Sequence, residues 1–245
     1  MPSVDYSPRF LHKTYLERDR ENPLRLGVYE AGAVVAPVSG ELRVYNAANV
    51  LLAQNETSAD AGGFALATVD PAQLAAQTLG ANWRVEWHLL MPDGLTHVFR
   101  AGAALCRVRL PQAASIADLL VWHADLNEYI PPTQTTWQPQ GDMAWADILN
   151  WIESKGRRPF LVTDSSELRE LHEAMWLERV GSALGADGDD TNRWVRLEAK
   201  WAGRAEKIRD GLTFEYDEND EGRATPGGRA AANPTLWLCQ AGEEW

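Results

Sequence analysis

Apolar and polar side chains alternate along the first half of the chain, in short segments separated by turn residues. Alternation with a period of two is typical of strands that bury one face of a sheet. The strand-like segments are residues 24–30, 41–46, 50–53, 64–69, 83–89, 96–100 and 104–110. The Asp93-Gly94 pair between two of them is typical of a hairpin turn. Short strands at this spacing predict an antiparallel β-sandwich of immunoglobulin-like type over residues 23–110.

The apolar period changes to that of an α-helix after residue 110. In residues 137–155, for example, Trp145, Ile148 and Ile152 recur at positions that share one helix face, and Gly156 follows as a stop. Two further helices are expected to begin at the capping residues Ser115 and Asp164, and a fourth is expected over about 191–211. A strand is expected at 212–217. The pattern therefore predicts a small four-helix domain with a terminal strand over residues 115–222.

The two ends of the chain show neither period. Pro2 and Pro8 discourage helix formation in residues 1–22, which we expect to form an extended N-terminal arm. Residues 223–245 begin with Gly, Ala, Pro and Arg and are expected to form an extended C-terminal tail. The predicted fold class is thus multidomain α+β, with a β-sandwich followed by a helical domain.

The charge is distributed unevenly over the chain, whose net charge is -12. Residues 1–110 hold 10 Lys and Arg against 11 Asp and Glu, whereas residues 111–245 hold 13 against 24. The acidic second half disfavours binding of DNA by phosphate neutralisation, and it suits a solvated surface or a wall past which DNA moves. No apolar run reaches the roughly 18–20 residues that span a bilayer, and the N-terminus does not resemble a secretory signal. We therefore expect synthesis in the cytoplasm and no membrane partner.

Tryptophan is unusually frequent, with 11 residues, most of them after residue 110. Trp is enriched in the hot spots of protein interfaces. A domain of about 100 residues is not expected to bury so many indoles, so some should face another subunit. The aromatic residues of the N-terminal arm are expected to pin it to a neighbour or to its own domain. The candidate interface residues are Tyr6, Phe10, Trp122, Trp137, Trp237 and Trp245.

No constellation of residues predicts catalysis. Phosphate-loop, nucleophile-elbow, zinc-pair and dinucleotide-binding motifs do not occur in the sequence, and its five His are scattered. The acidic run at 217–222 resembles the start of a calcium loop, but Gly228 stands where the bidentate Glu should be. Cys106 and Cys239 lack metal-site spacing and are expected to be reduced and buried. We expect no catalytic residue, no metal and no cofactor, and we predict that the protein is not an enzyme.

Several short segments, in order over about 200 residues, resemble the head–tail connector proteins of tailed bacteriophages, also called adaptor or neck proteins. They are Asn22-Pro23-Leu24, Gly80 with Trp83-Arg84-Val85-Glu86-Trp87, Pro92 and Gly94, His97 with Phe99-Arg100, Asp118-Leu119, Thr136-Trp137-Gln138-Pro139-Gln140 with Ala144-Trp145, and Leu212, Phe214 and Tyr216-Asp217 with Gly222. Residues 223–245 lie outside this resemblance.

The resemblance implies a structural protein of the virion neck. Its subunits would form a ring, expected to be a dodecamer, between the portal protein and the tail or stopper proteins. DNA would pass through the channel of this ring without specific binding.

A second interpretation assigns the protein to the tail or baseplate, with a β-sandwich that binds carbohydrate or a receptor. It depends on Trp83 and Trp87 as a surface platform for a sugar. Their alternation places both rings on one face, which more often indicates a core.

Overall fold

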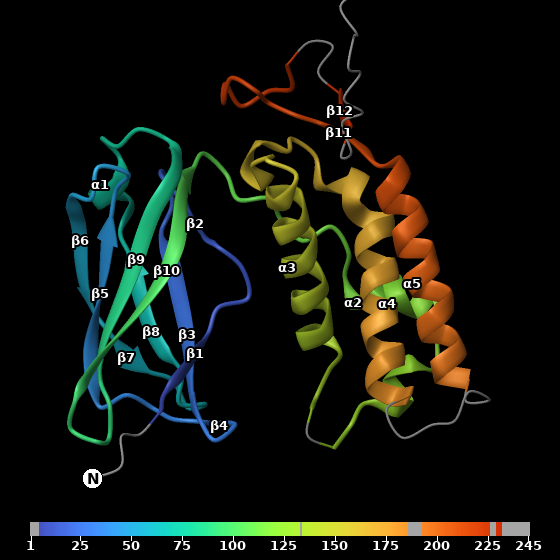
Figure 1. Cartoon of the computed structure of the whole chain (residues 1–245), viewed down its shortest axis with the longest axis horizontal. Helices are drawn as coiled ribbons and strands as arrows, with labels where there is room; N and C mark the ends of the chain where they lie inside the picture. The colour runs from blue at the N-terminus through green and yellow to red at the C-terminus, as the bar shows by residue number, and fades with distance from the viewer. Residues whose placement is uncertain (1–4, 133, 186–192, 226–228, 232–245) are drawn as a thin grey trace, which may run out of the picture. The chain divides into compact units, whose positions relative to one another are not determined.

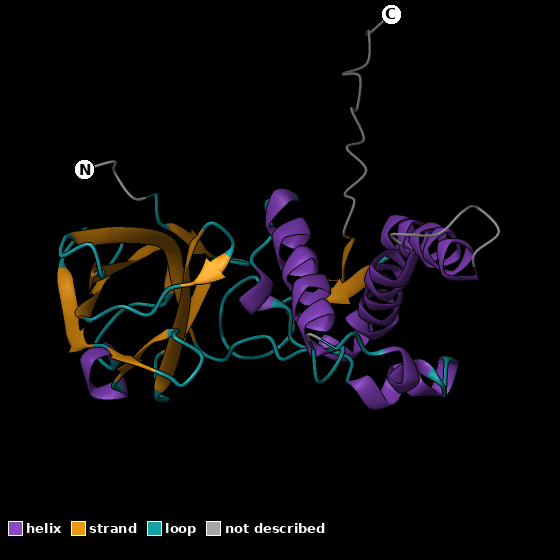
Figure 2. Cartoon of the chain, turned by 90° about the horizontal axis from the view of Figure 1, so that it is seen from below, coloured by secondary structure: helices purple, strands orange, loops and turns teal. Residues whose placement is uncertain are grey.

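A computed structural model describes residues 5–132, 134–185, 193–225 and 229–231 of the 245-residue chain. The chain divides into two compact units, Met1–Arg109 and Leu110–Trp245, which we call the β-rich unit and the helical unit. Antiparallel sheets and several helices are both present (Figure 1), and Figure 2 separates them by colour. The predicted mixture of α and β structure is therefore confirmed at this level.

The β-rich unit contains two five-stranded sheets. The strands are β1 (Ser7–Arg9), β2 (Thr14–Glu17), β3 (Asn22–Glu30), β4 (Ala33–Val34), β5 (Ser39–Tyr45), β6 (Leu51–Glu56), β7 (Ser58–Ala59), β8 (Ala65–Val69), β9 (Gly80–Leu90) and β10 (Thr96–Cys106), with the short helix α1 (Pro71–Leu74) before β9. One sheet has the order β1-β3-β8-β7, with β4 also paired to β3, and the other has the order β2-β10-β9-β5-β6. The β2–β10 pair is parallel, and the other pairs of these sheets are antiparallel.

Both sheets contribute side chains to one hydrophobic core. Val28 of β3, Val44 of β5 and Val85 of β9 are completely buried in the same cluster. Trp83 and Trp87 belong to this cluster as well, because alternate residues of β9 point to the same side. The rings on which the sugar-binding interpretation depends are therefore buried and do not form a surface platform.

The N-terminal segment is extended, but it is built into the sheets. Strand β1 pairs with β3 in one sheet, and β2 pairs with β10 in the other. Asn22 closes the turn after β2, since its side chain accepts a hydrogen bond from Glu17 N (2.7 Å) and donates one to Glu17 O (2.8 Å). The expected arm over residues 1–22 is therefore corrected from residue 7 onward to two strands of the β-rich unit.

The hairpin predicted at Asp93-Gly94 is confirmed. Gly94 has a φ of 80°, and the Asp93 side chain accepts a hydrogen bond from Leu95 N at 2.9 Å. The runs expected at 96–100 and 104–110 are instead one strand, β10, which ends at Cys106, so residues 107–110 are not strand. The alternation of apolar and polar residues is interrupted between the two predicted runs, and β10 accommodates this with a register shift between Ala103 and Leu105.

The helical unit contains helices α2 (Ile116–Trp122), α3 (Gln138–Ser154), α4 (Arg169–Gly185) and α5 (Arg193–Gly211). Short 3₁₀ helices occur at η1 (Leu126–Tyr129), η2 (Pro159–Leu161) and η3 (Ser165–Leu168), and strands β11 (Thr213–Glu215) and β12 (Arg229–Ala231) form a two-stranded sheet. Helix α4 packs against both α3 and α5 (Figure 1).

The helix expectations hold with two corrections. Helices α3 and α5 match the segments predicted at 137–155 and 191–211, and Gly156 follows α3 with a φ of 73°. The helix that starts after Ser115 ends at Trp122 and not at the predicted stop Pro131-Pro132, because His123 leaves the helical conformation (φ -144°, ψ 86°). Asp164 caps η3, and α4 continues from it. Part of the expected C-terminal tail forms β12, whereas residues 232–245 lie outside the described residues.

The helical unit buries more tryptophan than we expected. The buried indoles are Trp137, Trp145, Trp176, Trp194 and Trp201. Trp176 Nε1 donates to Trp137 O and Trp137 Nε1 donates to Leu126 O, both at 3.0 Å, so these buried N–H groups are satisfied. Room for the Trp176 ring comes from Gly141 of α3, since a Cβ there would lie 2.6 Å from its Cε2 and Cζ2 atoms.

A buried histidine lies among these rings. The His172 imidazole is 5.1 Å from the Trp145 ring and 5.5 Å from the Trp176 ring, measured between centroids. Its Nδ1 accepts a hydrogen bond from Ala114 N (3.1 Å), and its Nε2 lies 3.0 Å from Gly141 O. Since a carbonyl only accepts, this geometry requires the neutral tautomer with the proton on Nε2. Burial lowers the pKa of His172 below its ordinary value of 6.5, although nearby carboxylates oppose the shift.

Candidate partner interface

The structure distributes the predicted interface residues between core and surface. Tyr6 is buried in the core of the β-rich unit, and Phe10 packs against that core and lines a small surface pocket of about 260 Å³. Trp137 is 0% exposed, so its ring lies inside the helical unit. Trp237 and Trp245 lie outside the described residues. Trp122 is the predicted residue with a substantial exposed surface, at 45%.

Trp122 stands at the C-terminal end of α2, with one face packed and the other open. Its ring makes an edge-to-face contact with buried Trp201 of α5, with centroids 5.4 Å apart. Its Nε1 donates to Glu173 Oε2 at 2.9 Å, and the Arg204 guanidinium lies 5.0 Å from its ring centroid. The preceding Val121 is 83% exposed. The ring is thus held in one orientation before any partner binds, which lowers the entropic cost of binding.

A second aromatic pair continues this surface. Tyr129 of η1 contacts Trp194 of α5 edge to face, with centroids 4.8 Å apart, and it remains partly exposed. The Arg193 guanidinium lies 5.0 Å from the Tyr129 ring and 4.1 Å from the Trp194 ring, and it donates to Asp125 Oδ2 at 2.7 Å. We call Val121, Trp122 and Tyr129 the aromatic patch.

Helix α5 places a row of cations beside the aromatic patch. The row, which we call the basic stripe, consists of Arg193, Arg196, Lys200, Arg204 and Lys207. Residues three and four apart lie on the same helix face, so these five side chains project from one side of α5. The stripe is not apparent from the net charge of residues 111–245, because acidic residues elsewhere in this range outnumber its cations. Its signal was the spacing of Lys and Arg within the predicted helix.

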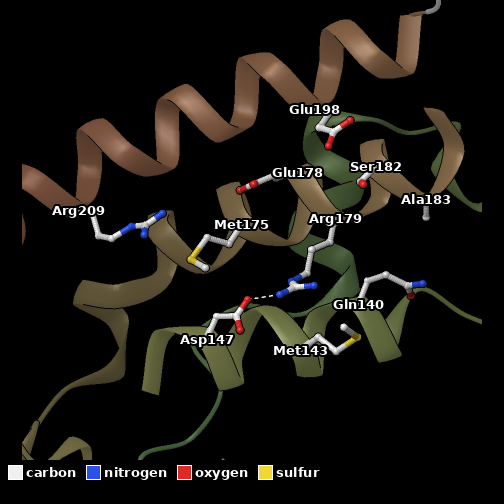
Figure 3. A pocket seen from close by; sticks show the side chains of 10 residues that line it. All are labelled: Gln140, Met143, Asp147, Met175, Glu178, Arg179, Ser182, Ala183, Glu198 and Arg209. Atoms are coloured by element: carbon white, nitrogen blue, oxygen red, sulfur yellow. Dashed lines mark hydrogen bonds and ion pairs between the residues drawn. The ribbon is translucent and has the colours of Figure 1, made fainter. Parts of the chain in front are cut away.

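A pocket of about 590 Å³ lies between α3, α4 and α5 (Figure 3). Two methionines, Met143 and Met175, line it together with charged groups. Arg179 of α4 points to Asp147 of α3 and forms an ion pair with it. Burial raises the pKa of the Glu178 carboxyl above its ordinary value, and the neighbouring Arg209 and Arg179 only partly oppose this.

Replacing Glu178 with glutamine is expected to stabilise the protein at pH 7 but not at pH 4. The raised pKa means that the folded chain holds the proton more tightly, so the native state loses stability as pH rises above 4.5. Glutamine carries no charge to desolvate. Because the group is partly solvated, the gain in melting temperature at pH 7 should be about 1–2 °C. Thermal unfolding of both proteins at the two pH values measures the difference, and an equal effect at pH 4 and pH 7 would contradict it.

The acidic turn that resembles a calcium loop uses its first carboxylate internally. The Asp217 oxygens accept hydrogen bonds from Glu221 N (3.0 Å) and Gly222 N (2.6 Å). Burial alone would raise the pKa of Asp217, but these and other backbone donors outweigh it and lower the pKa. Across the described ranges, no cluster of three or more His, Cys, Asp or Glu side chains is arranged to hold a metal ion. Cys106 is a buried thiol whose Sγ donates a hydrogen bond to Leu16 O at 3.2 Å, and Cys239 lies outside the described residues.

Among the described residues, no helix combines the length and apolar character needed to cross a membrane. Comparison with protein-family models and with curated proteins finds no match. Comparison with solved structures finds similarity to CopC from Methylosinus trichosporium OB3b, with a TM-score of 0.28 and 16% identity, covering 42% of this chain and 89% of CopC. Murine CRIg is also similar, with a TM-score of 0.28 and 9% identity, covering 41% of this chain and 96% of CRIg. At these TM-scores neither similarity bears on fold or function.

Proposed function

We propose that the chain is a structural virion protein, a head–tail connector that forms a ring between the portal and the tail and lines the DNA channel. In this proposal the β-rich unit is an immunoglobulin-like sandwich, and helices α2 to α5 form a four-helix domain. The protein acts by binding its neighbours and performs no catalysis. The proposal rests on the sequence resemblance and on one structural observation, the aromatic patch.

The aromatic patch has the properties of a binding surface. The helical unit buries five indoles in its core, so the core has room for tryptophan, and the exposure of Trp122 beside the 83% exposed Val121 needs another explanation. An aromatic ring held by a neighbour on one face and open on the other is the usual anchor of an interface hot spot. Glu173 and Arg204 hold the ring in place, and Trp122 still remains 45% exposed. These contacts support a role of Trp122 in partner binding. The proposal that the subunits form a ring between portal and tail rests on the sequence resemblance alone.

The sugar-binding alternative has less support. It requires an exposed pair of indoles on the β-rich unit, and Trp83 and Trp87 are both in the core. We therefore do not propose it as a second function. The experiment below can still detect it, as binding to tail tips or glycans.

Mixing the purified protein with portal complexes of tailed phages, followed by electron microscopy, tests the proposal. We expect a ring seated on the narrow end of the portal, whose symmetry gives the number of subunits. The protein alone and the portal alone serve as controls. Absence of association with portal, together with binding to tail tips or glycans, would replace the connector proposal with the alternative.

Replacing Trp122 with alanine is expected to weaken portal or ring association about tenfold or more, since loss of a hot-spot anchor typically has effects of this size. Sedimentation of portal mixtures at graded protein concentrations measures the change. Leu95→Ala, at an exposed apolar position of the β-rich unit, is the matched control and should bind normally. Far-UV circular dichroism verifies that the variant stays folded. Normal association of Trp122→Ala would show that the aromatic patch does not bind the partner.

A further inference from the structure

The basic stripe concentrates positive charge within an acidic unit. Residues 111–245 contain 13 Lys and Arg, and five of them lie on this one side of α5. From Arg193 to Lys207 the stripe runs along 14 helical steps, which corresponds to about 21 Å. Of the acidic residues of α5, Glu198 and Glu206 fall on other sides of the helix, whereas Asp210 lies three positions after Lys207 at the end of the stripe. The surface outside the stripe is correspondingly more acidic than the net charge suggests.

The stripe is open to solvent along most of its length. Arg193, Arg196, Lys200 and Lys207 are exposed, and Arg204 is half-buried beside Trp122. Arg193 and Arg204 have intramolecular acidic partners, Asp125 and Glu170. These ion pairs fix the two guanidinium groups against the aromatic patch. The stripe and the patch therefore form one continuous surface of cations and exposed apolar side chains.

An acidic surface is present elsewhere on the same unit. The segment that contains η3 packs against β11, since Thr163 N donates to Glu215 O (3.2 Å) and Asp217 N donates to Leu161 O (2.8 Å). Glu167 Oε2 accepts a hydrogen bond from Glu215 N at 2.6 Å, which brings the carboxylates of both segments to one edge. We call this surface the acidic edge. It consists of Glu167 and Glu215 with the exposed carboxylates Asp164 and Glu218 of the same two segments, and Glu218 also lies 3.8 Å from the Arg157 guanidinium.

We propose that the basic stripe of one copy of this chain binds the acidic edge of the next copy. The two surfaces are different patches of the same unit, so such a contact is head-to-tail, and head-to-tail contacts close into rings when the rotation permits. Charge complementarity selects a second copy as the occupant, with Trp122 and Val121 as the apolar centre of the contact. The inference rests on the proposed ring and names the surfaces that would form it. Duplex DNA is the less favoured occupant, because the acidic charge of residues 111–245 repels phosphate.

Charge reversal in the isolated full-length protein tests this contact. We would replace Lys200 and Lys207 with glutamate, and in a second variant also replace Glu215 and Glu218 with lysine. Sedimentation velocity over a concentration series measures self-association. The stripe reversal is expected to weaken self-association about tenfold or more, since like charges would then face each other. The fourfold variant reverses both surfaces and is expected to restore association while returning the net charge to that of the natural sequence.

A matched control separates the local contact from the change in net charge. Arg20→Glu with Lys155→Glu changes the net charge by the same amount at exposed positions outside the stripe, and it should leave association unchanged. Wild-type protein that stays monomeric at every concentration overturns the inference, as does a fourfold variant that associates no better than the stripe reversal. Binding of duplex DNA that the stripe reversal abolishes, measured by electrophoretic mobility shift, would assign the stripe to nucleic acid instead.

These outcomes are distinguishable from failure of the connector proposal. Stripe-dependent self-association without portal binding would leave the contact standing and remove the connector role. If the protein binds portal but neither charge reversal changes its self-association, the connector proposal would stand and the proposed contact would be wrong.

Discussion

Replacing Gly141 with alanine is expected to lower the free energy of unfolding by about 2–3 kcal/mol, as overpacking of a core typically does. In an ordinary helix position the same change stabilises, because alanine restricts the unfolded chain and favours the helix. Here the new Cβ would lie 2.6 Å from two atoms of the Trp176 ring. The ring cannot move aside cheaply, since it is completely buried and its Nε1 donates to Trp137 O. The steric cost therefore exceeds the gain in helix propensity.

Gly203→Ala is the matched control for this prediction. Gly203 lies in α5, and a Cβ there would meet nothing within 4 Å. We expect this variant to be more stable than the natural sequence by about 0.5–1 kcal/mol. Urea unfolding of both variants, followed by tryptophan fluorescence, measures the change in the free energy of unfolding, which should be negative for Gly141→Ala and positive for Gly203→Ala. A Gly141→Ala protein as stable as Gly203→Ala would show that α3 and α4 can separate to accept the methyl group.

Lowering the pH below 6.5 is expected to destabilise the helical unit through His172, by up to about 1.4 kcal/mol for each pH unit. The pKa of this histidine is lowered in the folded chain by burial. Below 6.5 the unfolded chain binds a proton that the native core does not, so stability is present above this pH and declines as the pH falls. Protonation of Nδ1 in the native state would also break the hydrogen bond from Ala114 N.

His172→Gln isolates this contribution from other titrating groups. The variant should be less stable than the natural protein at pH 7, because it loses the ring contacts with Trp145 and Trp176. Its stability should fall less steeply between pH 7 and pH 5, since glutamine does not titrate. His97→Gln, in the β-rich unit, is expected to leave the acid slope of the helical unit unchanged. Equal slopes for His172→Gln and the natural protein would contradict the prediction.

Local periodicity in the sequence was sufficient for most of the longer regular elements, but not for β1 and β2, which lie where an extended arm was expected. The spacing of Trp145, Ile148 and Ile152 identified α3, and all three residues are buried in the structure. Alternation identified β3, β5, β6, β8, β9 and β10 and placed Trp83 and Trp87 on one face. These signals follow from the backbone geometry of each element, so they can be read from neighbouring residues alone.

Contacts between distant segments could not be predicted in the same way. Gly141 in α3 makes room for Trp176, 35 positions along the chain, and nothing near either residue signals this. The candidate site shows the same limit. Trp122 follows an apolar run and Trp137 lies among polar residues, yet Trp122 is exposed, whereas Trp137 is buried and its Nε1 donates to Leu126 O. Only the basic stripe carried a local signal, in the spacing of its cations along α5.

The path of the N-terminal segment between the two sheets has a mechanical consequence. The chain pairs first in one sheet through β1, then in the other through β2, and returns to the first through β3. Because β2 and β10 are parallel, a force applied between the N-terminus and the end of β10 at Cys106 pulls the two strands lengthwise past each other. Their hydrogen bonds would then resist together and not break one at a time. The β-rich unit is thus suited to carry tension along the chain after the three residues of β1 have detached.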